Sequence, residues 1–186
     1  MKKVIIGWDV GTTGSICFLY ENESYESFDI PKYTTVTKKA KVKKIGEYKN
    51  GKPKYKTITP AKTRKHIDFK ELYNMLLLKV VSRDCVVYIE KQGCRPGNST
   101  ASCSKTMFNY GRSIQLLECI GVPYNIVSPN EWKKHFGLNG KDYKDNKDIA
   151  VEKAKELGFE CSVKRADPYE AFLIAKYGMH KDNECL

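Results

Sequence analysis

The sequence predicts an α/β or α+β domain, and two observations support this prediction. Short apolar runs rich in β-branched residues occur at residues 4–10, 85–90 and 124–127, which is typical of buried strands. Helical patterns with apolar faces follow the second and third of these runs, so strands and helices alternate in the second half of the chain. Because no internal repeat or clear boundary interrupts the 186 residues, we expect a single domain, 1–186, with a substantial core.

The first apolar run contains one carboxylate, Asp9. An ionised aspartate in a buried strand is costly unless a metal ion or a group of backbone N–H groups compensates its charge. Gly11 and Gly14 allow a sharp turn and the close approach of a ligand. Residues 15–20 are expected to return as a hairpin strand, and residues 23–30 to add a third strand. A metal at Asp9, a phosphate in the Gly-Thr-Thr-Gly turn, and a turn-capping role for Asp9 all remain open here.

Residues 32–65 contain thirteen basic residues and one acid, Glu47, and thus account for the net charge of +11. The turn signal at residues 50–53 separates two short runs that can pair, which predicts a projecting basic hairpin. A disordered loop is the alternative, because like charges repel one another. Tyrosines between the lysines favour a hairpin that grips phosphates. The charge indicates a polyanionic partner, either nucleic acid or an anionic membrane surface.

The chain lacks the sequence signals of a membrane or secreted protein. No run is long and apolar enough to span a bilayer, and Asp9 interrupts the only early apolar run, so that a signal peptide is not expected. The seven cysteines are an odd number without a CxxC pair, which fits free thiols in a reducing compartment. We therefore expect a cytoplasmic protein that does not bind a membrane.

The middle of the chain is predicted to form two helices around a strand. Asp68 and Glu71 make a capping-box-like start for a helix that continues to Val80. The strand at residues 85–90 ends in a carboxylate, Glu90. A helix is expected from about residue 104 to 121, and its apolar residues lie on two sides. Such a helix often packs against both a sheet and a partner subunit.

The C-terminal part is predicted to contain three helices. The first begins at Ser128-Pro129-Asn130-Glu131, with proline at its first position. A basic, glycine-containing loop at residues 137–147 precedes a helix from about 146 to 157. The last helix starts at Asp167-Pro168-Tyr169-Glu170, and the polar tail from Met179 is expected to fray.

Four acids lie where predicted elements begin or end: Asp9, Glu90, Asp167 and Glu170. Carboxylates crowded together repel one another unless a cation lies between them, and oxygen-only ligation suits Mg²⁺ or Mn²⁺. Two such ions would stabilise the attacking and leaving oxygens of a phosphodiester displacement. With a basic surface, this indicates a metal-dependent nuclease. Taken alone, Asp167 and Glu170 are better explained as an ordinary helix cap, and Glu90 alone is also compatible with an ion pair to Lys91 or Arg95.

Four motifs follow one another along the chain. They are Ile6-Gly7-Trp8-Asp9-Val10-Gly11, Tyr88-Ile89-Glu90-Lys91-Gln92, the stretch from Gly121 to Lys134, and the stretch from Asp167 to Ala175. In this order the chain resembles the RuvC-type Holliday junction resolvases, particularly those of phages and large DNA viruses. The resemblance covers most of the chain.

The resemblance implies a ribonuclease H-like fold, with a mixed central sheet flanked by helices and a basic hairpin or loop insertion at about residues 32–66. It also implies a homodimer that cleaves four-way junctions and other branched DNA by paired nicks. The implied cofactor is Mg²⁺, for which Mn²⁺ substitutes. The implied catalytic and metal-binding acids are Asp9, Glu90, Asp167 and Glu170. The DNA-binding residues that we expect are Lys91, Arg95, Lys105, Phe108, Lys133, Lys134, Lys144 and Lys147.

This chain departs from the family pattern at two places. Glu170 stands where cellular family members usually have aspartate, and its longer side chain affects the metal geometry. The basic insertion is longer than in the bacterial enzymes, so its role cannot be transferred from them. Phe108 is compatible with stacking at the branch point, with a place in the core, and with a dimer interface.

Three other functions compete with junction cleavage. The stretch from Asp9 to Ser15 also looks like the first phosphate motif of actin-like ATPases and sugar kinases, but these proteins need two such domains, and no second phosphate loop is present. A basic architectural protein would bind DNA without cutting it. A nuclease of the same fold would instead cut an RNA–DNA hybrid or flaps.

Overall fold

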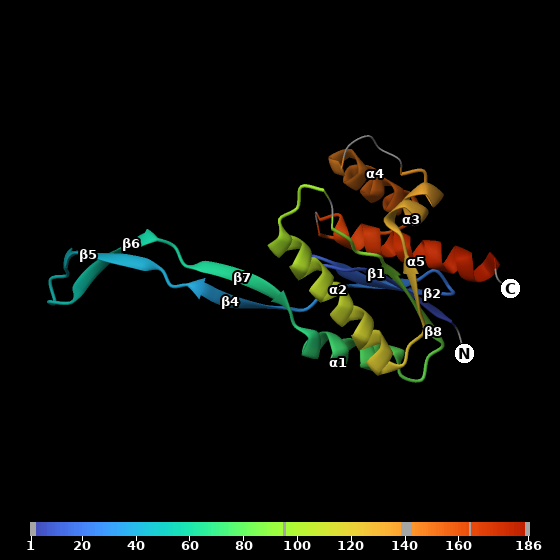
Figure 1. Ribbon diagram of the computed structural model, residues 1–186, viewed down its shortest axis with the longest axis horizontal. Coiled ribbons are helices and arrows are strands. Elements are labelled where there is room, and N and C mark those ends of the chain that lie inside the picture. Colours follow the sequence, from blue (N-terminus) through green and yellow to red (C-terminus); the bar gives the residue numbers. More distant parts are fainter. Residues whose placement is uncertain (1–2, 95, 139–142, 164, 185–186) are drawn as a thin grey trace.

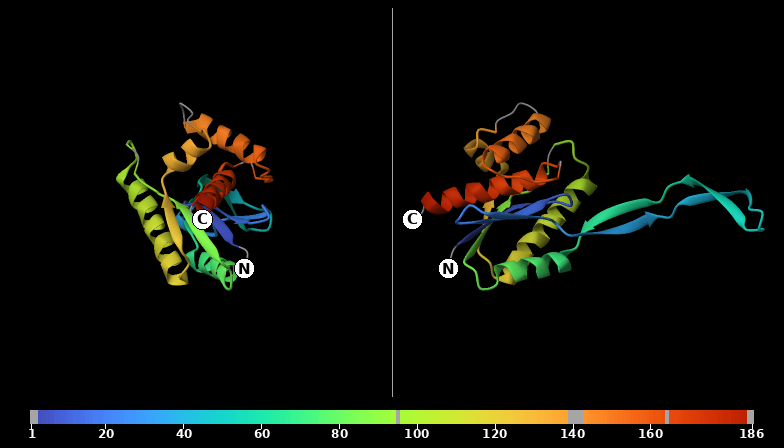
Figure 2. Two further views of the ribbon diagram at one scale, coloured as in Figure 1. Left: turned by 90° about the vertical axis from the view of Figure 1, so that its right-hand side faces the viewer. Right: turned by 180° about the vertical axis from the view of Figure 1, so that it is seen from behind.

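A five-stranded mixed sheet lies between two layers of helices in the computed structural model (Figures 1 and 2). The structure describes residues 3–94, 96–138, 143–163 and 165–184, apart from the side chains of residue 58 and residues 143–146. The strands of the sheet, in spatial order, are β3 (Tyr25–Asp29), β2 (Ser15–Tyr20), β1 (Val4–Asp9), β8 (Cys85–Glu90) and β9 (Tyr124–Val127).

The strand register brings two of the predicted acids side by side. Strands β1 and β8 are parallel, with Trp8 opposite Ile89, so Asp9 and Glu90 follow at the same edge of the sheet. Strand β9 continues the parallel half of the sheet, whereas β2 and β3 are antiparallel to their neighbours. The hairpin expected after Asp9 is present, because β2 pairs with β1 along its whole length.

Alternate residues of β1 face opposite helix layers, as the two-residue period of a strand requires. Ile5 packs on the layer of α5 (Asp167–Glu184), α4 (Tyr143–Glu156) and α3 (Pro129–His135). Ile6 and Trp8 pack on the other layer, which contains α1 (Phe69–Val80) and α2 (Thr100–Ile120). The end-on view of Figure 2 shows these two layers on either side of the sheet.

Gly7 allows α5 to pack directly on the backbone of β1. A Cβ atom at this position would overlap the carbonyl oxygen of Ala171 and the backbone nitrogen of Ala175. The buried face of α5 therefore approaches the strand more closely than a side chain at position 7 would permit. This packing holds the first turn of α5, with Asp167 and Glu170, near the edge of the sheet where Asp9 lies.

Residues 32–67 form a long hairpin that projects from the body of the protein (Figure 1). Its inner half pairs β4 (Lys32–Lys38) with β7 (Lys62–Ile67), and its outer half pairs β5 (Lys41–Glu47) with β6 (Pro53–Thr59). The predicted pairing is present, with Lys44 opposite Tyr55. The described side chains of the outer half are all exposed, so this half has no core of its own.

The structure corrects several predicted helix boundaries. Helix α2 begins at Thr100, with Ser99 as its N-cap, rather than near residue 104, because the Ser99 side chain accepts from the backbone of Ser102. The predicted fraying from Met179 is wrong: α5 continues to Glu184, since Met179 packs on the core and Lys181 pairs with Glu184. The spacing of the apolar residues of α1 predicts one buried face that includes Tyr73, but this side chain is 37% exposed.

No helix in the described part of the chain combines the length and the apolar character needed to cross a bilayer.

Candidate active site

The four predicted acids line one small cavity at the edge of the sheet. Asp9 ends β1, Glu90 ends β8, and Asp167 and Glu170 lie in the first turn of α5. The cavity has a volume of about 180 Å³. One side-chain oxygen each of Asp9, Asp167 and Glu170 lies within 4.8 Å of the other two. Three segments that are distant in the sequence thus bring carboxylates to one place.

The carboxylate of Glu90 accepts two hydrogen bonds from neighbouring side chains. The indole Nε1 of Trp132 donates to its Oε1 at 3.0 Å, and Nε2 of Gln92 donates to its Oε2 at 3.0 Å. Trp132 belongs to α3 and is fully buried. Both oxygens of Glu90 are therefore oriented by neighbouring side chains, which is the usual arrangement around a ligand to a metal.

Burial and mutual repulsion make the cluster hard to ionise fully. Burial raises the pKa of Asp9 well above its ordinary value, and the neighbouring carboxylates of Glu90, Glu170 and Asp167 raise it further. Burial also raises the pKa of Glu90, although the hydrogen bond from Trp132 acts in the opposite direction. The cluster therefore favours either bound protons or a bound cation.

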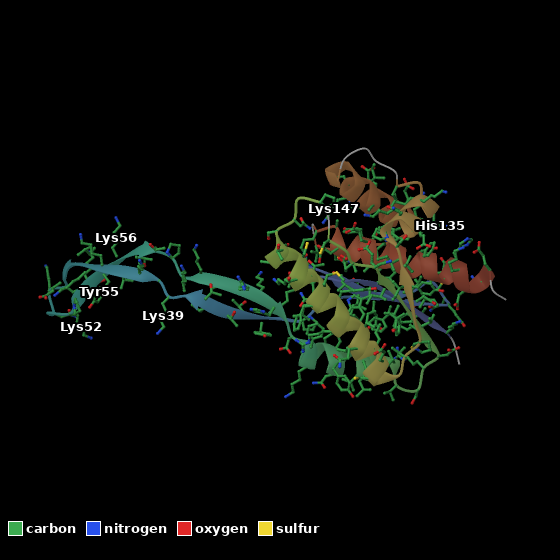
Figure 3. All side chains as sticks on the ribbon, in the orientation of Figure 1. Lys39, Lys52, Tyr55, Lys56, His135 and Lys147 are labelled. Atoms are coloured by element: carbon green, nitrogen blue, oxygen red, sulfur yellow. The ribbon has the colours of Figure 1, made fainter. Side chains whose placement is uncertain are left out.

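Two lysines bring positive charge to the same cavity. Lys133 of α3 places its Nζ 3.6 Å from Oε1 of Glu170, and Lys147 of α4 also lines the cavity. Lys147 lowers the pKa of Asp9, opposing the carboxylates. Figure 3 shows Lys147 between α4 and the first turn of α5. These cations partly balance the four carboxylates and can attract the phosphate of a substrate.

The loop between β1 and β2 helps to position the carboxylate of Asp167. The hydroxyl of Thr13 donates to Oδ1 of Asp167 at 3.4 Å. Gly14 is needed in this loop, since a Cβ atom there would overlap the carbonyl oxygen of Asp9. The backbone nitrogen of Glu170 donates to Ala166, and within the described residues no backbone N–H donates to the Asp167 carboxylate. Asp167 therefore contributes to the cavity rather than capping the helix.

The donor set fits a small divalent cation. Carboxylate oxygens are the preferred ligands of Mg²⁺ and Mn²⁺. Two oxygens bound to one Mg²⁺ lie at most about 4.2 Å apart, because each bond is roughly 2.1 Å long. The oxygens of Asp9, Asp167 and Glu170 all lie within 4.8 Å of one another, which is close to this spacing.

Comparison with known proteins identifies the fold. No family model matches the sequence, and no curated protein matches it. The structure is similar to that of T. thermophilus RuvC in complex with Holliday junction substrate, with a TM-score of 0.50 and 14% identity over 97% of this chain and 96% of that one. The chain has the ribonuclease H-like fold of RuvC. A second Thermus thermophilus RuvC structure gives a TM-score of 0.46, with 16% identity and 96% of each chain covered.

The RuvC-like fold does not bring every predicted DNA-binding residue to the carboxylates. Lys133 and Lys147 line the cavity, whereas Lys134 is exposed on α3 and outside its lining. Lys91 is exposed directly after Glu90. Lys105 and Phe108 lie on α2 and line a separate groove. Arg95 and the side chain of Lys144 lie outside the described residues.

Three residues that orient the acids were not predicted from the sequence: Gln92, Trp132 and Thr13. Gln92 is two positions after Glu90, a spacing that puts both side chains on the same side of an extended chain. Thr13 lies in the Gly-Thr-Thr-Gly turn that follows the first strand. Trp132 has no local signal, since its partner is 42 positions away in the sequence.

Proposed function

We propose that the protein is a divalent-metal-dependent endonuclease that cleaves four-way junctions and other branched DNA. The main support is the convergence of Asp9, Asp167 and Glu170 from two distant segments, beside Glu90, in a cavity that two lysines share. The RuvC-like fold supports a nuclease of this class. The excess of basic residues in the hairpin supports a polyanionic substrate.

The residues of the cavity have distinct roles in this proposal. Asp9, Asp167 and Glu170 hold the metal, and Glu90 completes the set in an orientation fixed by Trp132 and Gln92. When bound, Mg²⁺ activates water as the nucleophile and neutralises the charge that develops on the leaving oxygen. Lys133 and Lys147 attract the phosphate that is cut and offset the negative charge of the cluster.

We further propose that the active form is a homodimer. Paired nicks across a four-way junction require two active sites related by the two-fold symmetry of the junction. Each protomer carries one carboxylate cavity among its described residues. Two copies would therefore supply one cut on each of two strands.

Cleavage of defined DNA tests the proposal. A synthetic four-way junction, a linear duplex and an RNA–DNA hybrid of the same sequence are incubated with Mg²⁺ or with a chelator. The proteins compared are the wild type, Asp9→Asn, and Asp84→Asn as a matched control. Asp84 is an exposed aspartate that does not line the cavity, so this control removes the same charge elsewhere.

The expected result is symmetric nicking of the junction alone, lost with chelator and in Asp9→Asn but retained in Asp84→Asn. Asp9→Asn should bind the junction at least as tightly as the wild type, because it removes a negative charge facing the phosphate. Tight binding by wild type without any cut would favour the architectural alternative. Cutting of the hybrid alone would favour a ribonuclease H-like substrate.

A further inference from the structure

A second, larger cavity than the one at the carboxylates lies at the root of the hairpin. It is a groove of about 650 Å³ between β4, β7, the start of α1 and the N-terminal half of α2. A hydrogen bond links α2 to β7, since Nζ of Lys105 donates to the carbonyl oxygen of Lys65 at 3.3 Å. The hairpin therefore forms one wall of the groove and α2 forms the other.

Four aromatic side chains contribute to the lining of this groove: Tyr33, His66, Phe69 and Phe108. Tyr33 of β4 stacks on His66 of β7, with ring centroids 5.2 Å apart and planes inclined by 15°. On the opposite wall, Phe108 is 64% exposed, although it is a large apolar side chain. Exposed aromatic rings in a groove are suited to stacking on the flat faces of nucleobases.

Positive charge accompanies the rings. Arg64, Lys105 and Arg112 line the groove, and none of the described residues that line it is acidic. The guanidinium of Arg112 lies 3.9 Å from the ring centroid of Phe69 and 5.6 Å from that of Phe108. Such stacking holds a guanidinium flat against a ring while leaving its edge for a phosphate.

The groove is connected to the carboxylate cavity. A smaller cavity of about 270 Å³ lies between them. It shares Ser102, Lys105 and Asn109 with the groove. It shares Gly11, Thr13 and Gln92 with the carboxylate cavity. A continuous path therefore leads from the acids, along α2, to the root of the hairpin.

We propose that this groove holds unpaired nucleotides of the DNA strand that passes through the carboxylate cavity. The proposal rests on the proposed nuclease function and adds a binding site for the part of the substrate next to the cut. The bases stack on Tyr33 and Phe108, and the phosphates lie near Arg64, Lys105 and Arg112. The combination of a cationic groove with exposed rings is typical of sites for single strands rather than for duplexes, whose bases are hidden in the stack.

Binding without cleavage tests the proposal. Fluorescein-labelled oligo(dT) and a duplex of equal length are titrated in chelator with the wild type, Tyr33→Ala, Phe108→Ala and Tyr73→Ala. Tyr73 is an exposed tyrosine of α1 that does not line the groove, so it controls for the loss of an aromatic surface residue. Because Tyr33 and Phe108 are both exposed, melting curves of their variants should match the wild type.

Tyr33→Ala and Phe108→Ala should each weaken oligo(dT) binding by about 10-fold or more, the effect of losing one stacked base. Duplex binding should change by less than about 3-fold, Tyr73→Ala should behave as the wild type, and Tyr33→Phe should restore binding. A 2-aminopurine base in the oligonucleotide should lose fluorescence on the wild type and keep it on Phe108→Ala.

The proposal would be overturned if the two groove variants lost affinity for oligo(dT) and for the duplex equally, or if they lost no affinity. A second result would also overturn it: sedimentation shows that the wild type is a dimer and the groove variants are monomers, while the affinity of each protomer for oligo(dT) is unchanged. The groove of the wild type would then be covered by a second copy of the chain. The same variants are assayed for junction cleavage with Mg²⁺. If the wild type cuts no DNA but the two groove variants lose oligo(dT) binding, the groove proposal stands and the nuclease proposal fails.

Discussion

The indole of Trp132 donates its Nε1 hydrogen to Oε1 of Glu90, so a buried side chain of α3 orients a carboxylate at the end of β8. This hydrogen bond links the helix that carries Lys133 to the strand that carries Glu90. It also opposes the effect of burial on the pKa of Glu90. The geometry of the carboxylate cavity therefore depends on a residue that does not itself bind a metal.

Replacing Trp132 by phenylalanine should weaken metal binding. The variant loses the hydrogen bond to Glu90, and removing such an outer partner typically costs about 10- to 100-fold in metal affinity or activity. The measurement is the Mg²⁺ concentration that gives half-maximal junction cleavage. Trp8→Phe is the matched control, since Trp8 is also fully buried but its Nε1 has no partner among the described residues. Equal shifts in both variants would show that lost packing, rather than the hydrogen bond, causes the effect.

The stability of the metal-free protein should fall as the pH rises. The pKa of Asp9 is raised in the folded protein by burial and by its neighbouring carboxylates, so the folded state holds the proton more tightly than the unfolded chain does. The stabilisation is complete below the ordinary pKa of an aspartate, about 4, and is lost as the pH rises through the raised pKa.

Urea unfolding of metal-free protein at pH 5 and pH 8 measures this effect. Asp9→Asn cannot ionise, so its free energy of unfolding should fall less between these pH values and should exceed that of the wild type at pH 8. Mg²⁺ should stabilise the wild type at pH 8 more than it stabilises the variant. Parallel pH curves for the wild type and Asp9→Asn would contradict the assignment of a raised pKa.

Gly7→Ala should destabilise the fold and impair the site together. The added Cβ overlaps the backbone of α5 at Ala171 and Ala175, so the helix must move away from β1. Overpacking of this kind costs about 1–3 kcal/mol, and a shift of α5 also displaces Asp167 and Glu170. Gly111→Ala is the control, because Gly111 lies in α2 and has no neighbouring atom near the position of an added Cβ. Alanine there should raise the free energy of unfolding by about 0.5–1 kcal/mol. Thermal melting and Mg²⁺-dependent cleavage give the two measurements.

Shortening the hairpin should reduce DNA binding without unfolding the protein. Residues 39–61 contain eight lysines and one glutamate, and Lys38 pairs with Lys62, so an Asn-Gly turn can join these two residues. The plot of log affinity for duplex DNA against log salt should become less steep by about 0.9 for each phosphate that the shortened protein no longer neutralises. A full-length variant with the eight lysines changed to glutamine separates charge from length. An unchanged slope of this plot in both the shortened variant and the glutamine variant would mean that the outer hairpin does not bind DNA.

The strands and the positions of the first two acids follow from local sequence patterns. Buried strands appear as apolar runs, and the carboxyl ends of two parallel strands meet at one edge, which places Asp9 beside Glu90. The first turn of α5 was also predictable from the Asp-Pro-x-Glu pattern. The ribonuclease H-like fold itself was predicted from the order of the motifs and agrees with the comparison to RuvC.

Interactions between distant segments were not predictable from the sequence. The bond from Trp132 to Glu90 depends on how α3 packs beside β8, and tryptophan is common in cores for other reasons. The groove at the hairpin root joins Tyr33 to Phe108, which belong to elements with no shared sequence signal. The full length of α5 was missed because the polar residues after Met179 resemble a frayed end, whereas ion pairs with Glu184 support the last turn.

The order in which the acids appear along the chain has a consequence during synthesis. A nascent chain that has emerged only as far as α4 contains Asp9 and Glu90 but neither Asp167 nor Glu170. Its β1 strand also lacks the helix that covers Ile5. A ribosome-bound intermediate therefore lacks two of the four acids, and the carboxylate cavity is completed only after α5 has docked. In the proposed nuclease, the late position of this helix keeps incomplete polypeptides from cutting DNA.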